Sequence, residues 1–375
     1  MRTALLGAAG IIGREIARGL AKTTPNVLLC DVREKAVTSL AHELGAQAAT
    51  VDVTDVASTT RAIRGRDLVV NATLYYHNPE VMEACLAVGA NYLDLGGLYH
   101  TTRTQLRMHR RFEKEGLLAV LGCGKAPGMT NVLAASGAKS FDRVETVRLR
   151  SGRRPLQETS EARLPYSAQT LFDEFTLRPV VLEGGRLKEI EPLSRREVVR
   201  QPEPFGEIEY VTTLHSELAT LPRFLGKGVR TMDFQVALPT ATVDLLERLI
   251  LLGFASRDVV HVDGASVTPR DLAVAVLSSR PAPTVREVWI TEVEMAGRED
   301  GHPTTAFLRV TGDETQNGTA LAALSAVDLL RRRKIRGTGV HPPESIVPAK
   351  DFLLALRSHR LGVTETRIQT KELGS

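Results

Sequence analysis

Three glycines near the start of the chain have the spacing of a phosphate-binding turn. Gly7, Gly10 and Gly13 follow a short apolar run, Thr3–Leu6, and open a segment with apolar residues at helical spacing. Glycine permits a tight turn and a close approach of backbone N–H groups, and the N-terminus of a helix attracts anions. The spacing has one residue more before the second glycine than the usual G-x-G-x-x-G pattern. We predict that this turn binds the pyrophosphate of a dinucleotide.

An acidic residue follows at the position expected of a ribose ligand. Asp31 ends a second apolar run, residues 27–30, and stands 24 residues after Gly7. A carboxylate there accepts hydrogen bonds from the adenosine ribose and repels a 2′-phosphate, which favours NAD. Arg33 could instead hold such a phosphate, so binding of NADP stays open.

Further short apolar runs alternate with segments of helical periodicity over the first third of the chain. These runs span residues 48–51, 67–72, 91–95 and 117–122. Such alternation predicts an α/β domain with a doubly wound parallel sheet, the Rossmann fold. Ligands of these sheets bind outside the carboxyl ends of the strands, so we expect the site to lie where these runs end.

Polar and aromatic residues at these predicted strand ends could act on a substrate. Tyr75 and His77 follow the fourth apolar run and could form one wall of the site. Asp94 could accept a proton or bind an amine, or it could cap the following helix. Lys125 lies in a turn rich in glycine and proline, where it could bind a substrate carboxylate or face solvent.

A second group of candidate residues lies further along the chain. His215 and Glu217 come directly after a predicted strand. His215 could bind a carboxylate or transfer a proton, and Glu217 could pair with an amino group. Each of the two residues could equally have only a structural role.

The pattern of the chain changes near residue 126 and predicts a second domain. Strands are expected at 144–150, 209–214 and 231–238, with hairpins at 180–190 and 285–310. These segments predict an inserted α+β domain on a mainly antiparallel sheet. Helices at 318–332 and 351–360 should return to the first domain, and the polar tail after Gly362 should be loosely ordered. The expected boundaries are 1–125, 126–312 and 313–375.

Composition excludes several classes of protein. The chain has 375 residues, enough for two domains, with 43% hydrophobic and 25% charged residues and a net charge of +4. Charges of both signs are spread along the sequence, which argues against a nucleic-acid partner, and the lack of a long apolar run argues against a membrane span. The spacing of the three cysteines suggests neither disulfides nor a metal site. The short stretch before the first strand leaves no room for a signal sequence, so we expect a cytoplasmic enzyme.

Four motifs make the chain similar to the saccharopine dehydrogenase family, in the branch of saccharopine reductases and lysine 6-dehydrogenases. They are GAAGIIG at 7–13, VVNA at 69–72, YLDLGG at 92–97 and GKAPGMTNVLA at 124–134. The resemblance implies a homodimeric, nicotinamide-dependent oxidoreductase that acts on a C–N bond of an amino acid. It also implies a Rossmann domain that is interrupted by a substrate-binding and dimerisation domain.

The motifs and the resemblance together give two sets of expected site residues. The cofactor set would surround the phosphates, the adenosine and the nicotinamide: Gly7, Ala9, Gly10, Ile11, Ile12, Gly13, Asp31, Val32, Arg33, Asp52, Val53, Asn71, Ala72, Thr73, Leu95 and Gly96. The substrate set is Tyr75, His77, Asp94, Lys125, Pro127, Met129, Asn131, His215 and Glu217. Asp94 and His215 are the expected catalytic residues.

The reaction expected first is oxidative deamination of the ε-amine of L-lysine, with NAD as cofactor and NADP as an alternative. Hydride leaves the carbon that bears the amine, and water hydrolyses the resulting imine to a semialdehyde. We expect Asp94 to contact the reacting amine, and His215 or Glu217 to contact the distal amino-acid group. The alternatives are a saccharopine reductase, a carboxynorspermidine-type dehydrogenase, and an NAD-binding regulator without catalysis.

Overall fold

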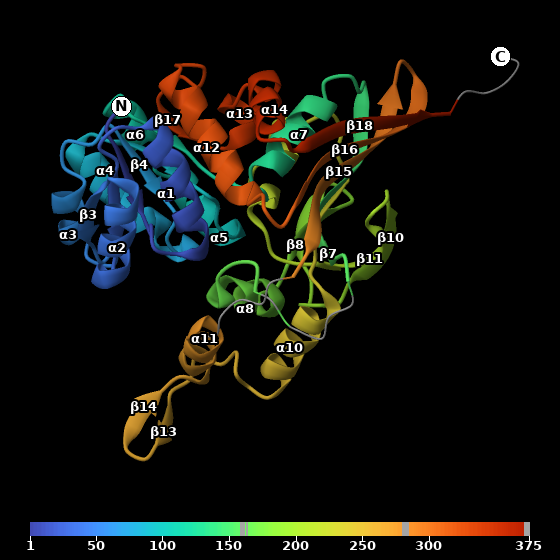
Figure 1. The fold of residues 1–375 in the computed structure, drawn as a ribbon. Coiled ribbons are helices and arrows are strands. Elements are labelled where there is room, and N and C mark those ends of the chain that lie inside the picture. Colours follow the sequence, from blue (N-terminus) through green and yellow to red (C-terminus); the bar gives the residue numbers. More distant parts are fainter. Residues whose placement is uncertain (158–161, 163, 280–284, 371–375) are drawn as a thin grey trace, which may run out of the picture.

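Seven parallel strands form the first sheet of this computed structural model, in the order β17-β6-β5-β4-β1-β2-β3 (Figure 1). The structure describes residues 1–157, 162, 164–279 and 285–370. The strand order reverses between β1 and β4, which is where doubly wound sheets open a crevice for ligands. The α/β class and the parallel sheet are therefore confirmed. The strands are β1 (Thr3–Leu6), β2 (Leu28–Asp31), β3 (Gln47–Thr50), β4 (Leu68–Asn71), β5 (Asn91–Asp94), β6 (Leu118–Val120) and β17 (Gly339–His341).

The helices of the first domain pack on this sheet through apolar stripes. Helix α1 (Ile11–Thr23) begins directly after the glycine turn and buries Ile16, Ala17 and Leu20. Helix α12 (Gly318–Arg331) approaches α1 so closely that a Cβ atom on Gly19 would lie 2.2 Å from Leu324 Cδ1. A helix from the end of the chain thus packs on the glycine-turn helix. The other elements are α2 (Glu34–Leu44), α3 (Val56–Ala62), η1 (Tyr75–His77), α4 (Asn78–Val88), α5 (Tyr99–Leu106) and α6 (His109–Lys114).

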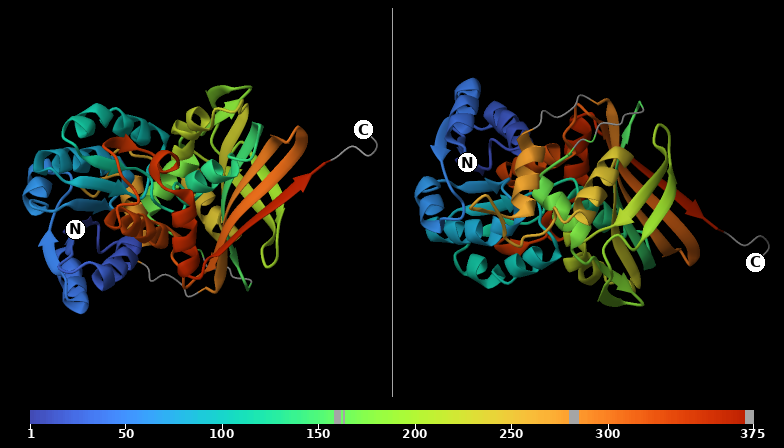
Figure 2. Two further views of the ribbon diagram at one scale, coloured as in Figure 1. Left: turned by 90° about the horizontal axis from the view of Figure 1, so that it is seen from above. Right: turned by 90° about the horizontal axis from the view of Figure 1, so that it is seen from below.

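A nine-stranded second sheet follows the path β10-β11-β12-β7-β15-β16-β18, and β8 pairs with both β12 and β9. The β12 and β7 strands are parallel, whereas the other pairs are antiparallel, which confirms the predicted α+β domain on a mainly antiparallel sheet. Figure 2 shows the two sheets side by side. The strands are β7 (Arg143–Pro155), β8 (Val180–Glu183), β9 (Arg186–Glu189), β10 (Arg196–Gln201), β11 (Gly206–Thr212), β12 (Thr231–Ala237), β15 (Glu287–Glu299), β16 (His302–Asp313) and β18 (Gly362–Gln369).

One continuous apolar core joins the two sheets. It includes Leu5 and Val70 of the first sheet together with Val147, Val293 and Leu308 of the second. Because these side chains share one core, the carboxyl ends of the first sheet are held against the second domain. The remaining elements of the second half are α7 (Met129–Gly137), α8 (Ala168–Thr176), η2 (Ser216–Ala219), α9 (Leu221–Leu225), α10 (Thr240–Leu251), β13 (Val260–Val262), β14 (Ala265–Val267), α11 (Pro269–Ser279), α13 (Pro343–Ile346) and α14 (Ala349–Ser358).

The chain after Gly362 differs from the expectation of a loose tail. Strand β18 pairs antiparallel with β16, from Gly362 opposite Thr311 to Gln369 opposite Thr304. An edge strand is held by backbone hydrogen bonds and needs no apolar side chains, so its polar sequence looked like a loop. The prediction is therefore wrong as far as Gln369, and residues 371–375 lie outside the described part.

None of the helices in the described ranges is long and apolar enough to cross a membrane. The three cysteines, Cys30, Cys85 and Cys123, are free and buried. The domain boundaries at 125 and 312 stay predictions.

Candidate active site

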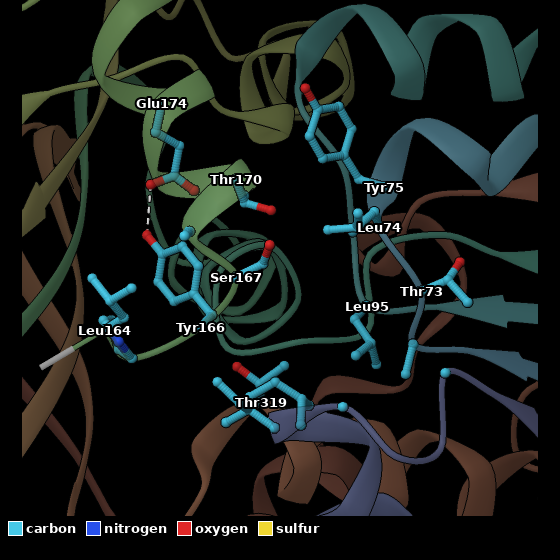
Figure 3. A pocket seen from close by; sticks show the side chains of 18 of the residues that line it. Thr73, Leu74, Tyr75, Leu95, Leu164, Tyr166, Ser167, Thr170, Glu174 and Thr319 are labelled. Atoms are coloured by element: carbon cyan, nitrogen blue, oxygen red, sulfur yellow. Dashed lines mark hydrogen bonds between the residues drawn. The ribbon is translucent and has the colours of Figure 1, made fainter. Parts of the chain in front are cut away.

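A cavity of about 1600 Å³ lies where the carboxyl ends of the first sheet meet the second domain. Its volume exceeds the roughly 300–1,000 Å³ of an ordinary small-molecule site. One end is lined by the glycine turn and the ends of β1 to β5, and the other by β7, β12, α8 and α10. Figure 3 shows side chains from both ends facing this space. The expected site residues that line it are Gly7, Gly10, Ile11, Ile12, Asp31, Val32, Arg33, Asp52, Val53, Ala72, Thr73, Tyr75, His77, Leu95, Gly96, Lys125, Pro127 and His215.

The glycine turn has the shape of a phosphate cradle. Gly7 has φ +75°, and a Cβ atom there would lie 2.7 Å from the carbonyl oxygen of Ala72. Gly10 is the N-cap of α1 and offers no side chain to the helix end. Within the described residues, the backbone N–H groups of Ile11 and Ile12 have no hydrogen-bond partner. These free donors at a helix N-terminus fit the pyrophosphate of a dinucleotide.

An acidic and a basic side chain, Asp31 and Arg33, lie together at the end of the cavity where the adenosine is expected. Asp31 Oδ2 accepts a hydrogen bond from Ala9 N at 2.9 Å, and Oδ1 accepts one from Arg33 Nε at 3.0 Å. The Asp31 carboxylate is buried, whereas more than half of the Arg33 side chain is exposed. Asp31 is therefore fixed where a ribose would bind, and Arg33 stands beside it at the mouth of the cavity.

Asp94 lies outside the cavity lining and is 1% exposed. Its Oδ1 accepts hydrogen bonds from Gly96 N at 2.9 Å and Gly122 N at 2.6 Å, and its Oδ2 from Gln105 Nε2 at 2.6 Å and Asn78 Nδ2 at 3.2 Å. Burial raises the pKa of Asp94, and these donors oppose the rise. The placement contradicts the prediction that Asp94 contacts a reacting amine, because both of its oxygens already accept hydrogen bonds. Oδ1 binds the loops after β5 and β6, and Oδ2 binds α5 and α4.

Three other expected substrate residues also lie behind the cavity wall. Met129 is fully buried, and Asn131 accepts from Gly128 N at 2.9 Å while donating to Glu344 Oε2 at 2.8 Å. Glu217 is fully buried and accepts from Thr130 Oγ1 at 2.7 Å. These side chains shape the turn and the base of the site instead of facing a ligand, which corrects their predicted roles.

Three residues of the expected cofactor set, Ala9, Gly13 and Asn71, do not line the cavity. Ala9 and Gly13 belong to the glycine turn. Asn71 Oδ1 accepts a hydrogen bond from Thr73 Oγ1 at 2.7 Å and is 1% exposed. Their contact with the cofactor stays a prediction, and the structure shows Asn71 holding Thr73, which does line the space.

His215 is the expected catalytic residue that does line the cavity. Its Nδ1 is hydrogen-bonded to Glu217 Oε2, and its ring stacks on Phe234 with a centroid distance of 3.7 Å. Burial lowers the pKa of His215, but the charge and hydrogen bond of Glu217, together with the charge of Glu174, raise it above the usual value. The ring is thus held in place at the cavity wall, and the carboxylates of Glu217 and Glu174 stabilise its protonated form.

Lys125 also lines the cavity, although it is only 8% exposed. Its Nζ lies 5.1 Å from the centre of the Trp289 ring. Burial, reinforced by the charge of Arg153, holds the pKa of Lys125 well below its usual range, and the charge of Glu287 opposes this effect. Of the two placements that the sequence left open for Lys125, the structure has the one that faces the cavity.

Sequence reasoning missed the part of the cavity that α8 builds. Glu174 and Tyr166 both line the space and are joined by a hydrogen bond from Tyr166 Oη to Glu174 Oε2 at 2.6 Å (Figure 3). The neighbouring Asp173 accepts a hydrogen bond from Tyr75 Oη at 2.9 Å, which links α8 to the first domain. The acidic pair inside the apolar run LFDEF, residues 171–175, was the available signal.

Two family descriptions together match nearly the whole chain. The saccharopine dehydrogenase NADP binding domain matches residues 3–120, and the saccharopine dehydrogenase C-terminal domain matches residues 124–361. The chain belongs to the saccharopine dehydrogenase family. It is therefore an oxidoreductase of that family, and its cofactor is a nicotinamide dinucleotide.

Relatives with known names and a solved structure agree with this family. Carboxyaminopropylagmatine dehydrogenase of Synechocystis is 25% identical over 294 residues, which cover 74% of this chain and 72% of the relative. Carboxynorspermidine synthase of Vibrio cholerae is 22% identical over 281 residues, which cover 70% and 66%. The apo saccharopine dehydrogenase (L-Glu forming) of Saccharomyces cerevisiae has a TM-score of 0.76 at 14% identity and covers 98% and 99% of the two chains. This last likeness shows a shared fold.

Proposed function

We propose that this protein is a nicotinamide-dependent dehydrogenase of a secondary amine that carries an amino-acid group. In the reducing direction it would join an amino-acid aldehyde to a second amine by reduction of their imine. The observation that carries this proposal is one continuous cavity with two kinds of lining. The glycine turn and strand ends fit the dinucleotide, and buried Lys125, Glu174 and His215 face the remaining space.

The names of the relatives support a substrate of this kind. Both names describe a secondary amine that carries a carboxyl group: agmatine with a carboxyaminopropyl group in one case, and norspermidine with a carboxyl group in the other. Such a compound has one arm on each side of the reacting nitrogen. A cavity of about 1600 Å³ offers room for a dinucleotide and for a two-armed substrate together.

A side chain of the protein would transfer the proton to and from the substrate nitrogen in this reaction. A bound nicotinamide supplies or accepts the hydride. His215 would exchange the proton of the substrate nitrogen, because Glu217 holds Nδ1 and leaves Nε2 for the cavity. In the oxidising direction the neutral ring takes a proton from the ammonium, and in the reducing direction the imidazolium returns it to the new amine.

The direct test is consumption of NADPH or NADH by purified protein. The aldehyde is L-aspartate semialdehyde, which has the carboxyaminopropyl skeleton, and the amine is agmatine or 1,3-diaminopropane. We expect oxidation of the reduced nicotinamide only when aldehyde and amine are both present. Oxidation by the aldehyde alone, or no oxidation with any amine, would contradict the proposal.

The same assay run in reverse tests the lysine reaction, which stays a prediction. Turnover of NAD or NADP with L-lysine alone would establish oxidative deamination of a free ε-amine. Turnover only with saccharopine would instead require a glutamate arm on the nitrogen. The homodimer also stays a prediction, and analytical ultracentrifugation of the purified protein tests it.

We further propose that Asp31 and Arg33 set the cofactor preference. Substitution of Asp31 by Ala, with Arg33 retained, removes the carboxylate that repels a 2′-phosphate. The affinity ratio of NADPH to NADH should then rise by about tenfold, since the repulsion between the carboxylate and the 2′-phosphate is lost. Arg33→Ala should lower the same ratio. Fluorescence titrations with both reduced cofactors measure it, and an unchanged ratio in both variants would refute the assignment.

A further inference from the structure

Two hydrogen bonds connect the first turn of α7 to the histidine of the cavity wall. Thr130 Oγ1 donates to Glu217 Oε1 at 2.7 Å, and Glu217 Oε2 is hydrogen-bonded to His215 Nδ1. Thr130 and Glu217 are fully buried, whereas His215 lines the cavity. The threonine belongs to the GKAPGMTNVLA motif, so the structure links this motif to a side chain that faces the substrate space.

The hydroxyl group of Thr130 is directed at the carboxylate. A threonine hydroxyl has one hydrogen to donate. A second oxygen, Asn131 Oδ1, lies 3.4 Å from Thr130 Oγ1, and it already accepts a hydrogen bond from Gly128 N at 2.9 Å. The shorter contact of 2.7 Å therefore takes the hydrogen. Glu217 is held through Oε1, and its other oxygen is left for the histidine.

The surroundings of Glu217 favour its ionised form. In the part of the chain that the structure describes, His215 is the one cationic side chain that pairs with it. Thr130 is the second residue of α7, and the partial positive charge at a helix N-terminus stabilises a carboxylate. Because a carboxylate only accepts hydrogen bonds, His215 Nδ1 must carry the hydrogen that the two share.

The plane of the imidazole ring is fixed by a second contact. The ring stacks on Phe234 with a centroid distance of 3.7 Å and an angle of 12° between the planes. The two segments are joined by a hydrogen bond from Thr213 N to Phe234 O at 3.2 Å. Stacking sets the plane of the ring, and the bond to Glu217 sets its rotation within that plane. No described residue is hydrogen-bonded to Nε2, which lies on the far side of the ring from Glu217.

We propose that Thr130 and Glu217 are positioning residues for proton transfer by His215. Thr130 holds the carboxylate of Glu217, and the carboxylate keeps a hydrogen on Nδ1 of the ring. Nε2 is then left to give a proton to the substrate nitrogen or to take one from it. This inference rests on the proposed function, in which His215 exchanges that proton. It assigns to the reaction two buried residues that do not touch the substrate.

The charges around His215 give the proposal a pH dependence. Burial lowers the pKa of His215, but the charge and hydrogen bond of Glu217, together with the charge of Glu174 on α8, raise it above its usual value. Burial, together with the charge of Glu217, raises the pKa of Glu344 on α13 to about 7. Reduction of an imine to an amine uses the imidazolium form, so turnover should fall as the pH rises through the pKa of His215. Loss of Glu217 lowers that pKa and moves the fall to lower pH.

The first test records kcat for the reductive reaction between pH 6 and pH 9, with L-aspartate semialdehyde, the amine and the reduced cofactor at saturation. Glu217→Gln should move the midpoint of the profile down by at least about one pH unit. At pH 8 its kcat should fall about 100-fold, while KM for the aldehyde changes less than about threefold. Thr130→Val should move the midpoint in the same direction by about half a unit. Thr130→Ser keeps the hydroxyl group and should keep the profile of the unaltered protein.

The control variant is Thr304→Val, which removes the hydroxyl group of another buried threonine. Thr304 Oγ1 donates to His302 O at 3.2 Å on β16, and the residue does not line the cavity. Its profile and kcat should be unchanged. A lower kcat with an unmoved midpoint in both Glu217→Gln and Thr130→Val would overturn the proposal, because loss of packing alone has that effect. Absence of any turnover in the unaltered protein would instead count against the proposed function.

The second test needs neither cofactor nor turnover. The full-length protein is labelled with nitrogen-15 in its histidines, and the ring signals of His215 are identified by their absence from His215→Gln. Nitrogen chemical shifts show which ring nitrogen carries the hydrogen. We expect a hydrogen on Nδ1 of the neutral ring in the unaltered protein, and a lower titration midpoint in Thr130→Val than in Thr130→Ser. A neutral ring with its hydrogen on Nε2, or equal midpoints in the two threonine variants, would overturn the proposal even if Glu217→Gln does not fold.

Discussion

Replacement of Asp94 by Ala should destabilise the folded protein by at least about 3 kcal/mol, even without cofactor or substrate. Four donors point at its carboxylate, two of them backbone N–H groups of Gly96 and Gly122. Each buried donor left without an acceptor costs about 1–3 kcal/mol. Urea unfolding of the cofactor-free protein measures the loss.

Asp94→Asn separates this structural role from a catalytic one. The amide keeps an oxygen for Gly96 and Gly122, and Gln105 can rotate its own amide to accept from the new donor. We expect a smaller loss of stability and retained turnover. Asp52→Ala is the control, because Asp52 is an exposed acid at the end of β3, and its loss should change stability by less than about 1 kcal/mol. A stable but inactive Asp94→Asn would show that Asp94 takes part in the chemistry.

Replacement of Gly13 by Ala should weaken both the fold and the cofactor site. A Cβ atom there would lie 2.0 Å from the carbonyl oxygen of Gly7, and the contact is with backbone, which must move. Overpacking of this kind costs about 1–3 kcal/mol. The shift also displaces the turn whose free N–H groups face the cavity, so affinity for NADH and NADPH should fall more than about tenfold by fluorescence titration.

Gly10→Ala is the matched variant in the same turn. Its Cβ atom would lie 3.2 Å from the same oxygen, and its φ of −70° suits any residue. We expect nearly unchanged stability and weaker cofactor binding, because the methyl group stands where the phosphates approach the backbone. If Gly10→Ala binds cofactor normally, the dinucleotide does not use this turn, whatever Gly13→Ala does.

Much of the first domain could be predicted because its signals are local. The turn at Gly7 requires a positive φ, which glycine adopts readily, and α1 buries residues at helical spacing. Strands β1 and β4 are buried along their whole length, so their apolar runs are unmistakable. In contrast, the edge strands β10 and β18 carry mostly exposed polar residues, and their sequences gave no such signal.

The residues of the candidate site also differ in whether a local sequence signal could identify them. Asp31 was predictable because its distance from the glycine turn is characteristic of dinucleotide binding. Asp94 was misassigned because a strand-end acid looks the same in sequence whether it faces a ligand or accepts four internal hydrogen bonds. Glu174 was missed because the acidic pair in the run LFDEF does not by itself show that it faces a cavity. Its environment comes from Tyr166, just before its helix, and from His215 on a distant segment.

The sequence by itself determined the doubly wound first sheet, the dinucleotide turn, the second domain and the family. Each of these depends on backbone preferences and side-chain spacing among residues close together in the chain. Only the tertiary structure decided which charges are buried, paired or open to the cavity. Lys125, Glu174 and His215 come from three separate segments, and the ionisation of each depends on burial and on neighbours that the fold brings together.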